Sequence, residues 1–384
     1  MKYKIKIIIS VILLSGTLLS GCGAPATSAT NSTTSTFNST SVVTSTTTVA
    51  TITASSTTPE ITRTQHELLP LAGTYMNSIT SGPDGNLWFT EVGANKIGKM
   101  SPATGDFTLY DVPTGNAAPN VITSGPDGNL WFTETNADKI GKISPVDGKI
   151  IEYDVPFSGY IRSSPDGITS GPDGNLWFTN VDTNKIGKIS PATGVITIYD
   201  VPTAIAGPKG IVAGPDGNLW FTESYVNKIG KLSPVTGNIT EYKVSDLSAP
   251  VLSRGIVVGP DGNLWFIASM TNQIGKISPV TGEVTEYHAP TYRASPIGIT
   301  VGPDGNLWFT ESLGNQIDKI SPIMGIITQY PISTANAGPS GIAAGPDGNL
   351  WFTELFTNKI GKISLKDGII TEYPINNQSQ KYLK

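Results

Sequence analysis

From about residue 75 onward, hydrophobic and polar residues alternate in short runs that are separated by tight turns. In the first unit the runs are residues 78–81, 86–91, 96–100 and 107–110. The turn at residues 83–85 reads Pro-Asp-Gly: Pro presets φ, Asp bonds the nearby backbone, and Gly accepts a positive φ. Runs this short and rich in β-branched and aromatic residues, with no segment of helical period, predict an all-β fold.

The unit occurs seven times. The segment Gly-Pro-Asp-Gly-Asn-Leu-Trp-Phe recurs at intervals of 43 to 46 residues and contains every tryptophan of the chain. These are Trp88, Trp131, Trp177, Trp220, Trp265, Trp308 and Trp351. A four-stranded sheet of this size cannot bury both faces alone, whereas a closed ring of such sheets can. We therefore expect a seven-bladed β-propeller with four antiparallel strands per blade, over residues 61–375.

Two segments compete for the last strand of that ring. Residues 61–70 align with a fourth strand, yet the seventh unit has its own fourth strand at residues 369–373. Either segment can close the ring, and the other is then an extra edge strand or unpaired.

The N-terminus reads as a targeting signal. Three lysines at positions 2, 4 and 6 precede the apolar run 7–14, which is too short to span a membrane, so residues 1–21 are predicted to be a signal peptide. Leu19-Ser20-Gly21-Cys22 resembles the lipobox of prokaryotic lipoproteins, in which cleavage precedes a lipidated Cys. The alternative is a free thiol at Cys22 behind an ordinary signal peptide.

Residues 22–60 are predicted to form the lipidated Cys and a disordered stalk. Between residues 24 and 60, 22 of 37 positions are Ser or Thr and the one charge is Glu60, so little apolar surface is available to offset ordering entropy. Asn31 and Asn38 begin N-glycosylation sequons. Residues 376–384 are a C-terminal tail. The expected location is outside the cytoplasm, with lipid attaching the protein to the cell membrane or envelope.

Charge and cysteine content exclude several classes. The net charge is −5, and removal of residues 1–21 takes away three lysines and makes it −8, which argues against a nucleic-acid partner. A single Cys excludes a disulfide framework and Cys-rich metal sites. We expect a monomer whose partner is a small molecule, a peptide or an envelope component.

The segments Gly-Pro-Asp-Gly-Asn-Leu-Trp-Phe-Thr-Glu, Asn-Lys-Ile-Gly-Lys-Ile-Ser and Ile-Thr-Glu-Tyr, joined by Pro-x-Gly-Ile, resemble the virginiamycin B lyase (streptogramin lyase) family over residues 62–375. The resemblance implies a seven-bladed propeller. In the antibiotic-inactivating members it also implies a Mg²⁺-assisted elimination that opens a cyclic depsipeptide at its ester. The family places histidines at the x position of the last two blades, one of them preceded by Glu-Pro, and a glutamate near the end of the Trp-Phe strand.

This chain departs from that pattern. The two matching x positions are Ile297 and Ser340, and Gly338 stands where the family has the preceding Glu. His288 falls at the end of a fourth strand, and so on the outer rim, and His66 lies at the stalk boundary. The sequence thus predicts that the family's catalytic histidines are absent.

The x positions precede the innermost strands and are expected at the mouth of the central channel. They are Asn77, Asn120, Asp166, Lys209, Arg254, Ile297 and Ser340. These polar side chains could hold an anionic or zwitterionic molecule, since Arg pairs with carboxylates. Alternatively, the x residues satisfy one another.

Two further sets recur in the repeats. The Trp-Phe strand ends in a carboxylate in five blades, and these could bind a divalent cation such as Mg²⁺ if they converge, or else pair with lysines or cap loops. They are Glu91, Glu134, Glu223, Glu311 and Glu354, with Asn180 and Ala268 in the other two blades. A lysine in the third strand of every blade is predicted to be structural. These are Lys99, Lys142, Lys188, Lys231, Lys276, Lys319 and Lys362.

Two functions from different classes follow. The first is a lipid-anchored binding or scaffold propeller with its ligand at the channel mouth. The second is a metal-dependent lyase or hydrolase that opens cyclic depsipeptides or lactones, for which Glu311 and Glu354 are the candidate catalytic residues.

Overall fold

The computed structural model describes residues 75–156, 162–244 and 254–375. The predicted signal peptide, Cys22, the stalk, residues 61–70, His66 and the C-terminal tail lie outside the described residues. No helix in the described segments is long and apolar enough to cross a membrane.

Each blade contributes one strand to each of four concentric positions. The innermost strands are β1 (Met76–Ser81), β5 (Pro119–Ser124), β9 (Pro165–Ser170), β13 (Pro208–Ala213), β17 (Ile256–Val258), β21 (Pro296–Val301) and β25 (Pro339–Ala344). The second strands are β2 (Leu87–Glu91), β6 (Leu130–Glu134), β10 (Leu176–Asn180), β14 (Leu219–Glu223), β18 (Leu264–Ala268), β22 (Leu307–Glu311) and β26 (Leu350–Glu354). The third strands are β3 (Lys96–Met100), β7 (Lys139–Ile143), β11 (Lys185–Ile189), β15 (Lys228–Leu232), β19 (Gln273–Ile277), β23 (Gln316–Ile320) and β27 (Lys359–Ile363). The outer strands are β4 (Phe107–Asp111), β8 (Ile150–Asp154), β12 (Ile196–Asp200), β16 (Ile239–Lys243), β20 (Val284–His288), β24 (Ile327–Pro331) and β28 (Ile370–Pro374). A 3₁₀ turn, η1 (Ser269–Thr271), follows β18.

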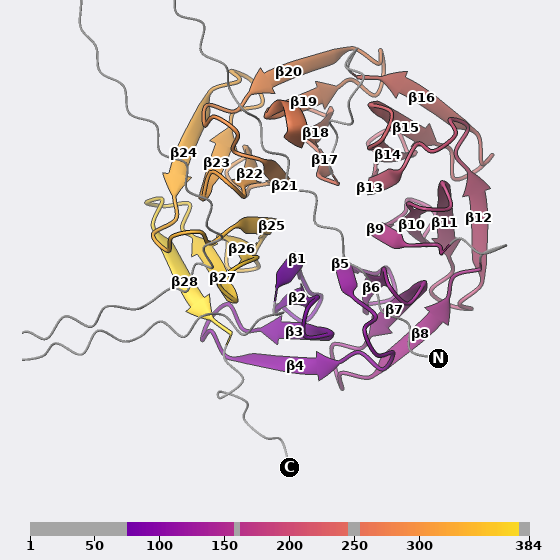
Figure 1. Ribbon diagram of the computed structural model, residues 1–384, viewed down its shortest axis with the longest axis horizontal. Coiled ribbons are helices and arrows are strands. Elements are labelled where there is room, and N and C mark those ends of the chain that lie inside the picture. Colours follow the sequence, from indigo (N-terminus) through magenta and orange to yellow (C-terminus); the bar gives the residue numbers. More distant parts are fainter. Residues whose placement is uncertain (1–74, 157–161, 245–253, 376–384) are drawn as a thin grey trace, which may run out of the picture. The chain divides into compact units, whose positions relative to one another are not determined.

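Consecutive strands pair antiparallel into seven four-stranded sheets, blades 1 to 7 in chain order. Figure 1 shows them around a central axis, with β1, β5, β9, β13, β17, β21 and β25 innermost. The predicted seven-bladed propeller is confirmed. β28 pairs with β27, so residues 370–374 supply the outer strand of blade 7.

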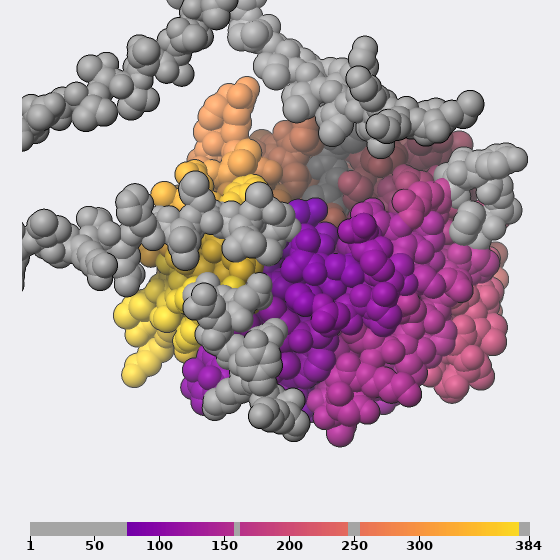
Figure 2. Space-filling view, turned by 60° about the horizontal axis from the view of Figure 1, so that its bottom comes forward, coloured from indigo at the N-terminus to yellow at the C-terminus, as the bar shows by residue number. Residues whose placement is uncertain are grey.

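The ring closes by side-to-side packing of blades 7 and 1. The Ser81 hydroxyl, at the end of β1, donates to the Ala344 carbonyl oxygen of β25 at 2.6 Å. Figure 2 shows blade 1 in indigo between the yellow blade 7 and the magenta blade 2. Ser124 and Ser170 repeat the bond into the preceding blade at 2.7 Å each.

A buried tryptophan organises each blade. Trp88 is fully buried, and its indole N–H donates to the turn residue Asp84 at 3.0 Å. The Tyr110 ring stacks on it at 5.7 Å between centroids, and Lys99 Nζ lies 5.3 Å from the Trp88 ring and 2.7 Å from Asp84. The remaining blades repeat the indole bond at 2.9–3.0 Å and the lysine contact at 5.1–5.4 Å. The recurrent lysines are therefore structural, as predicted.

A second recurring contact joins each blade to the next one. In blade 2 the Thr133 hydroxyl accepts the Val121 N–H at 3.1 Å and donates to the Asp166 carbonyl oxygen of blade 3 at 2.7 Å. Thr90, Thr179, Thr310 and Thr353 make the same pair of bonds. We call this the threonine bridge; it holds the backbone of the x residues in place. Blade 5 has the buried Ile267 at this position.

Replacing Thr133 by valine keeps the shape but leaves the Val121 N–H and the Asp166 carbonyl oxygen without this partner. Because an unsatisfied buried polar group costs about 1–3 kcal/mol, the Thr133→Val variant should lose stability in that range. Denaturant unfolding measures the loss. Thr240, exposed on β16, provides the control: Thr240→Val should change stability by less than about 0.5 kcal/mol. Equal effects of the two changes would contradict the role of the bridge.

Candidate functional site

The seven x residues lie at the same end of the inner strands, where they surround the channel mouth. Six are the second residue of their strand, and Arg254 lies two residues before β17. Below them is a cavity of about 170 Å³, lined by residues from all seven blades. The lining includes four of the seven x positions: the predicted ligand-binding residues Asn77, Arg254 and Ser340, and also Ile297.

Neighbouring x residues bind one another on one side of the mouth. The Asn77 side-chain amide donates to the Asn120 side-chain oxygen, and the Ser340 hydroxyl donates to the Asn77 side-chain oxygen at 3.1 Å. This chain joins blades 7, 1 and 2. Ser340 is only 1% exposed, so its hydroxyl is committed to that bond.

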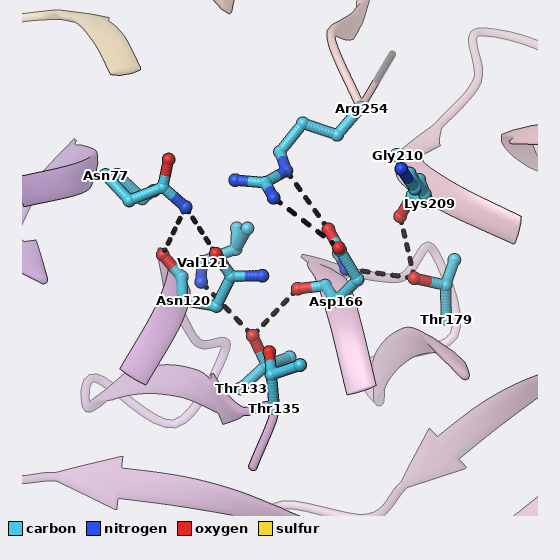
Figure 3. A network of polar contacts seen from close by, with 12 residues as sticks. Asn77, Asn120, Val121, Thr133, Thr135, Asp166, Thr179, Lys209, Gly210 and Arg254 are labelled. Carbon is cyan, nitrogen blue, oxygen red and sulfur yellow. Dashed lines mark hydrogen bonds and ion pairs between the residues drawn. The ribbon is translucent and has the colours of Figure 1, made fainter. Parts of the chain in front are cut away.

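On the other side of the mouth an ion pair joins blades 3 and 5. Arg254 Nε lies 3.1 Å from Asp166 Oδ1, and Nη2 donates to Oδ2 at 3.5 Å (Figure 3). In blade 4, between them, Lys209 Nζ lies 5.7 Å from the centre of the Tyr225 ring. Five of the seven x residues are thus paired with one another, which matches the alternative in which the x residues satisfy one another's hydrogen bonds and charges.

The structure describes most of the positions at which the resemblance implies catalytic residues. Gly338 has φ +63°, and a Cβ on it would lie 2.4 Å from the Phe356 ring. A glutamate there would meet both a strained backbone and an occupied space. His288 ends the outer strand β20 and is exposed. Among the described residues, no imidazole is therefore available at the mouth.

The five strand-end glutamates do not converge on one cation. Each is buried within its own blade, and the described part of the chain contains no group of three or more His, Cys, Asp or Glu side chains that could hold a metal ion. Glu354 accepts a hydrogen bond from the Thr357 hydroxyl, and Ser340 is bound to Asn77. The mouth residues therefore do not fit the Mg²⁺ that the resemblance implied.

The sequence interpretation missed that four of these glutamates adjoin a second carboxyl group; in blade 6, Glu311 lies beside Asp318. Burial, and next the charge of Glu152, raise the pKa of Glu134 to about 8. Glu152 accepts the Thr114 N–H at 2.8 Å and the Thr114 hydroxyl at 2.7 Å. The same arrangement recurs as Glu223 with Glu241 and Glu354 with Glu372. The sequence contained a sign of these pairs: the segment Ile-Thr-Glu-Tyr carries a glutamate in the outer strand, two strands away from the strand-end glutamate of the same blade.

These raised pKa values predict how stability depends on pH. In the folded state the pKa values of Glu91, Glu134, Glu223 and Glu354 are raised to about 7 or 8, whereas in the unfolded chain these carboxyl groups lose their protons near pH 4.5. The contribution of these groups to the free energy of unfolding is therefore greatest below about pH 4.5 and is lost as the pH rises through 8. Each such group loses about 1.4 kcal/mol per pH unit within that window. Unfolding measured from pH 5 to pH 8 should show the decline.

The Glu134→Gln variant should lose part of this slope, because the amide stays neutral at every pH. It should match the wild type near pH 5 and exceed it at pH 8. Glu283, exposed in a hairpin, gives the control: Glu283→Gln should keep the full slope. Stability that rises between pH 5 and 8 would show that the buried carboxyls are ionised in the folded state.

Comparison with known proteins places the chain. The sequence profile of the virginiamycin B lyase family matches residues 42–253 and 248–383. A solved streptogramin B lyase is 40% identical over 77% of this chain and 94% of its own, with a TM-score of 0.70. A Staphylococcus aureus virginiamycin B lyase, in which a histidine is replaced by alanine, is 38% identical over 77% and 96% of the two chains, with a TM-score of 0.69; it is described as catalytically inactive and was solved with quinupristin.

A Kuenenia stuttgartiensis hydrazine synthase chain shares the fold alone, at 16% identity over 81% of this chain and 98% of its own, with a TM-score of 0.60. None of the curated proteins matches the chain. The profile and the streptogramin lyase structures cover nearly the whole propeller. The chain belongs to the virginiamycin B lyase family.

Proposed function

We propose that this protein is a ligand-binding propeller rather than a lyase, carried outside the cytoplasm by a lipid on Cys22 and the Ser/Thr-rich stalk. The observation that carries the proposal is the composition of the channel mouth. Ile297 and the buried, hydrogen-bonded Ser340 occupy the two positions at which the family resemblance implies catalytic histidines.

The elimination needs a base within hydrogen-bonding reach of the substrate α-proton. Asp166, an x-position carboxylate, is paired with Arg254. Ser340 and Asn77 are neutral at ordinary pH and bind each other. The relative that lost one histidine is described as catalytically inactive, which supports the same conclusion for a chain with none at these positions.

The chemistry of the mouth favours a small anionic or zwitterionic ligand. A cavity of about 170 Å³ lies below the range of about 300–1,000 Å³ that is typical of drug-sized sites. Lys209 supplies an ammonium group that lies over the face of the Tyr225 ring. Arg254 supplies a planar guanidinium group whose parallel N–H donors match the two oxygens of a carboxylate. Asn77 and Asn120 add amide groups at the same level.

The first and last described strands of the propeller have their free ends at the mouth end of the ring. Tyr75 precedes Met76, which pairs with Glu91 at that end of blade 1. In blade 7, Pro374 pairs with Lys359 at the corresponding end, so both ends of the described propeller leave from the mouth side.

Enzyme assay tests the choice between binding and lysis. With quinupristin as substrate, with and without Mg²⁺, the protein should show no ring opening, while the S. aureus virginiamycin B lyase serves as the positive control. Turnover that is abolished by EDTA and by Glu354→Gln would overturn the proposal in favour of the metal-dependent lyase.

Calorimetry with succinate and L-glutamate tests the ligand class. Because a charged hydrogen bond contributes about 1.5–3 kcal/mol, Lys209→Gln should weaken carboxylate binding by about 10-fold or more. Lys366→Gln, at an exposed hairpin of blade 7, should leave binding unchanged. Equal affinity in the wild type, Lys209→Gln and Arg254→Gln would exclude the mouth as the carboxylate site.

A further inference from the structure

The loops at the mouth end of the ring differ between the two halves of the propeller. Each second strand ends beside the start of the inner strand, as Glu223 pairs with Pro208, so the loop that follows it lies at the mouth. In blades 1 to 3 the second residue of this loop is small or polar: Gly93, Asn136 and Asp182. In blades 4 to 7 it is large and apolar: Tyr225, Met270, Leu313 and Phe356. We call these four residues the apolar arc.

The side chains of the apolar arc are exposed and belong to consecutive blades. Their exposed fractions are 43% for Tyr225, 78% for Met270, 71% for Leu313 and 52% for Phe356. Figure 1 shows the strands that precede them, β14, β18, β22 and β26, along one half of the ring. Exposed apolar side chains that gather on one face mark sites at which a ligand, a membrane or a protein binds.

At blade 4 the apolar arc adjoins the cation of the mouth. The Tyr225 ring packs on the backbone before Lys209, since a Cβ on Gly207 would lie 2.5 Å from that ring. The Lys209 ammonium group lies 5.7 Å from the centre of the same ring. Within the described segments of the chain, no carboxylate forms an ion pair with Lys209. The arc therefore begins beside a positive charge that has no acidic partner among these residues.

At blades 6 and 7 the apolar arc adjoins the cavity of the mouth. The Phe356 ring packs on Gly338, two residues before Ser340. Ile297, the apolar member of the x residues, lines the cavity from blade 6, the blade that carries Leu313. Apolar side chains of this half of the ring thus occur both in the cavity lining and on the loops around it.

The backbone of the apolar arc offers few hydrogen-bond donors to a ligand. The N–H groups of Tyr225, Leu313 and Phe356 already donate to carbonyl oxygens of the connection from the preceding blade, at 2.9–3.2 Å. A peptide on this surface would need donors for its carbonyl groups, whereas a hydrocarbon chain needs none. The arc is therefore better suited to a hydrocarbon chain than to a peptide backbone.

We propose that the channel mouth binds a single-chain carboxylate amphiphile, with the chemistry of a fatty acid, whose carboxylate pairs with Lys209 and whose chain lies on the apolar arc. This inference rests on the proposed ligand-binding function and specifies its ligand. The cavity of about 170 Å³ admits only a small group, so most of a long ligand lies outside it, on the loops. The carboxylate gains a charged hydrogen bond, and the chain removes apolar surface of the loops from water.

Calorimetry with acetate, hexanoate and decanoate, each below its micelle concentration, tests the role of the chain. Complete burial of one CH₂ group raises affinity about 4-fold, and a chain that lies on an open surface should gain about 2-fold for each CH₂ group. Decanoate should therefore bind at least about 10-fold more tightly than hexanoate. Lys209→Gln should weaken the binding of both acids and keep the ratio between them.

Two exposed residues of the apolar arc separate the chain from the carboxylate. The double variant Met270→Ser with Leu313→Ser should bind decanoate about 5-fold or more weakly than the wild type and should bind succinate equally well. Because both side chains are exposed, the variant should fold normally. The matched control is Val280→Ser with Ile323→Ser, which should bind decanoate as the wild type does. These residues are 89% and 87% exposed and follow β19 and β23 of the same two blades, at the end away from the mouth.

Four results would overturn this inference. Equal affinity for hexanoate and decanoate, with succinate binding that Lys209→Gln weakens, would reject the chain site while the proposed function stands. Tighter binding of N-acetyl-Leu-Phe than of decanoate would make the ligand a peptide. Sedimentation with phosphatidylcholine vesicles that the double variant abolishes, without binding of monomeric decanoate, would make the arc a membrane contact. Binding of no carboxylate of any length would reject the proposed ligand class together with this inference.

Discussion

The propeller depends on burying an indole in every blade without leaving its N–H unpaired. A buried Trp needs a hydrogen-bond acceptor, and the aspartate of the turn just before the strand supplies it at 2.9–3.0 Å in each blade. That aspartate is then a partly buried anion, which the third-strand lysine compensates from above the same ring. The turn aspartate, the second-strand tryptophan and the third-strand lysine therefore depend on one another through a hydrogen bond, an ion pair and a cation–π contact. This mutual dependence explains why the three residues recur together in every repeat.

The same arrangement leaves the mouth residues free to differ. The threonine bridge holds the x residue through its backbone carbonyl oxygen, as in the 2.7 Å bond from Thr133 to Asp166. A side chain at a bridged position can therefore be Asn, Asp, Lys or Ser with little consequence for the sheet. The side chains at the x positions differ between blades because only the backbone of these residues is needed for the sheet. The family resemblance implies catalytic residues at two of these same positions.

Local patterns in the sequence predict the fold well here because every element is specified within about 43 residues. Strand order, the structural lysines and the position of the x residues at the channel follow from the repeat. The ion pair between Asp166 and Arg254 does not, since it joins residues 88 positions apart through the curvature of the ring. The sequence left open whether the strand-end glutamates converge or pair within their blades; the register of each sheet directs them into their own blades, where Glu134 lies beside Glu152.

The departures of this chain from the pattern that the family resemblance implies come in coupled sets of residues. Gly338 is accompanied by Phe356, whose ring occupies the space of a side chain at residue 338. Ser340 is accompanied by Asn77, which accepts its hydroxyl, and Asn77 in turn binds Asn120. A histidine at residue 340 would break that chain of hydrogen bonds, and a glutamate at 338 would collide with the ring. Placing a histidine at residue 340 and a glutamate at residue 338 therefore requires concerted change in blades 7 and 1, because Asn77 and Phe356 would have to change with them.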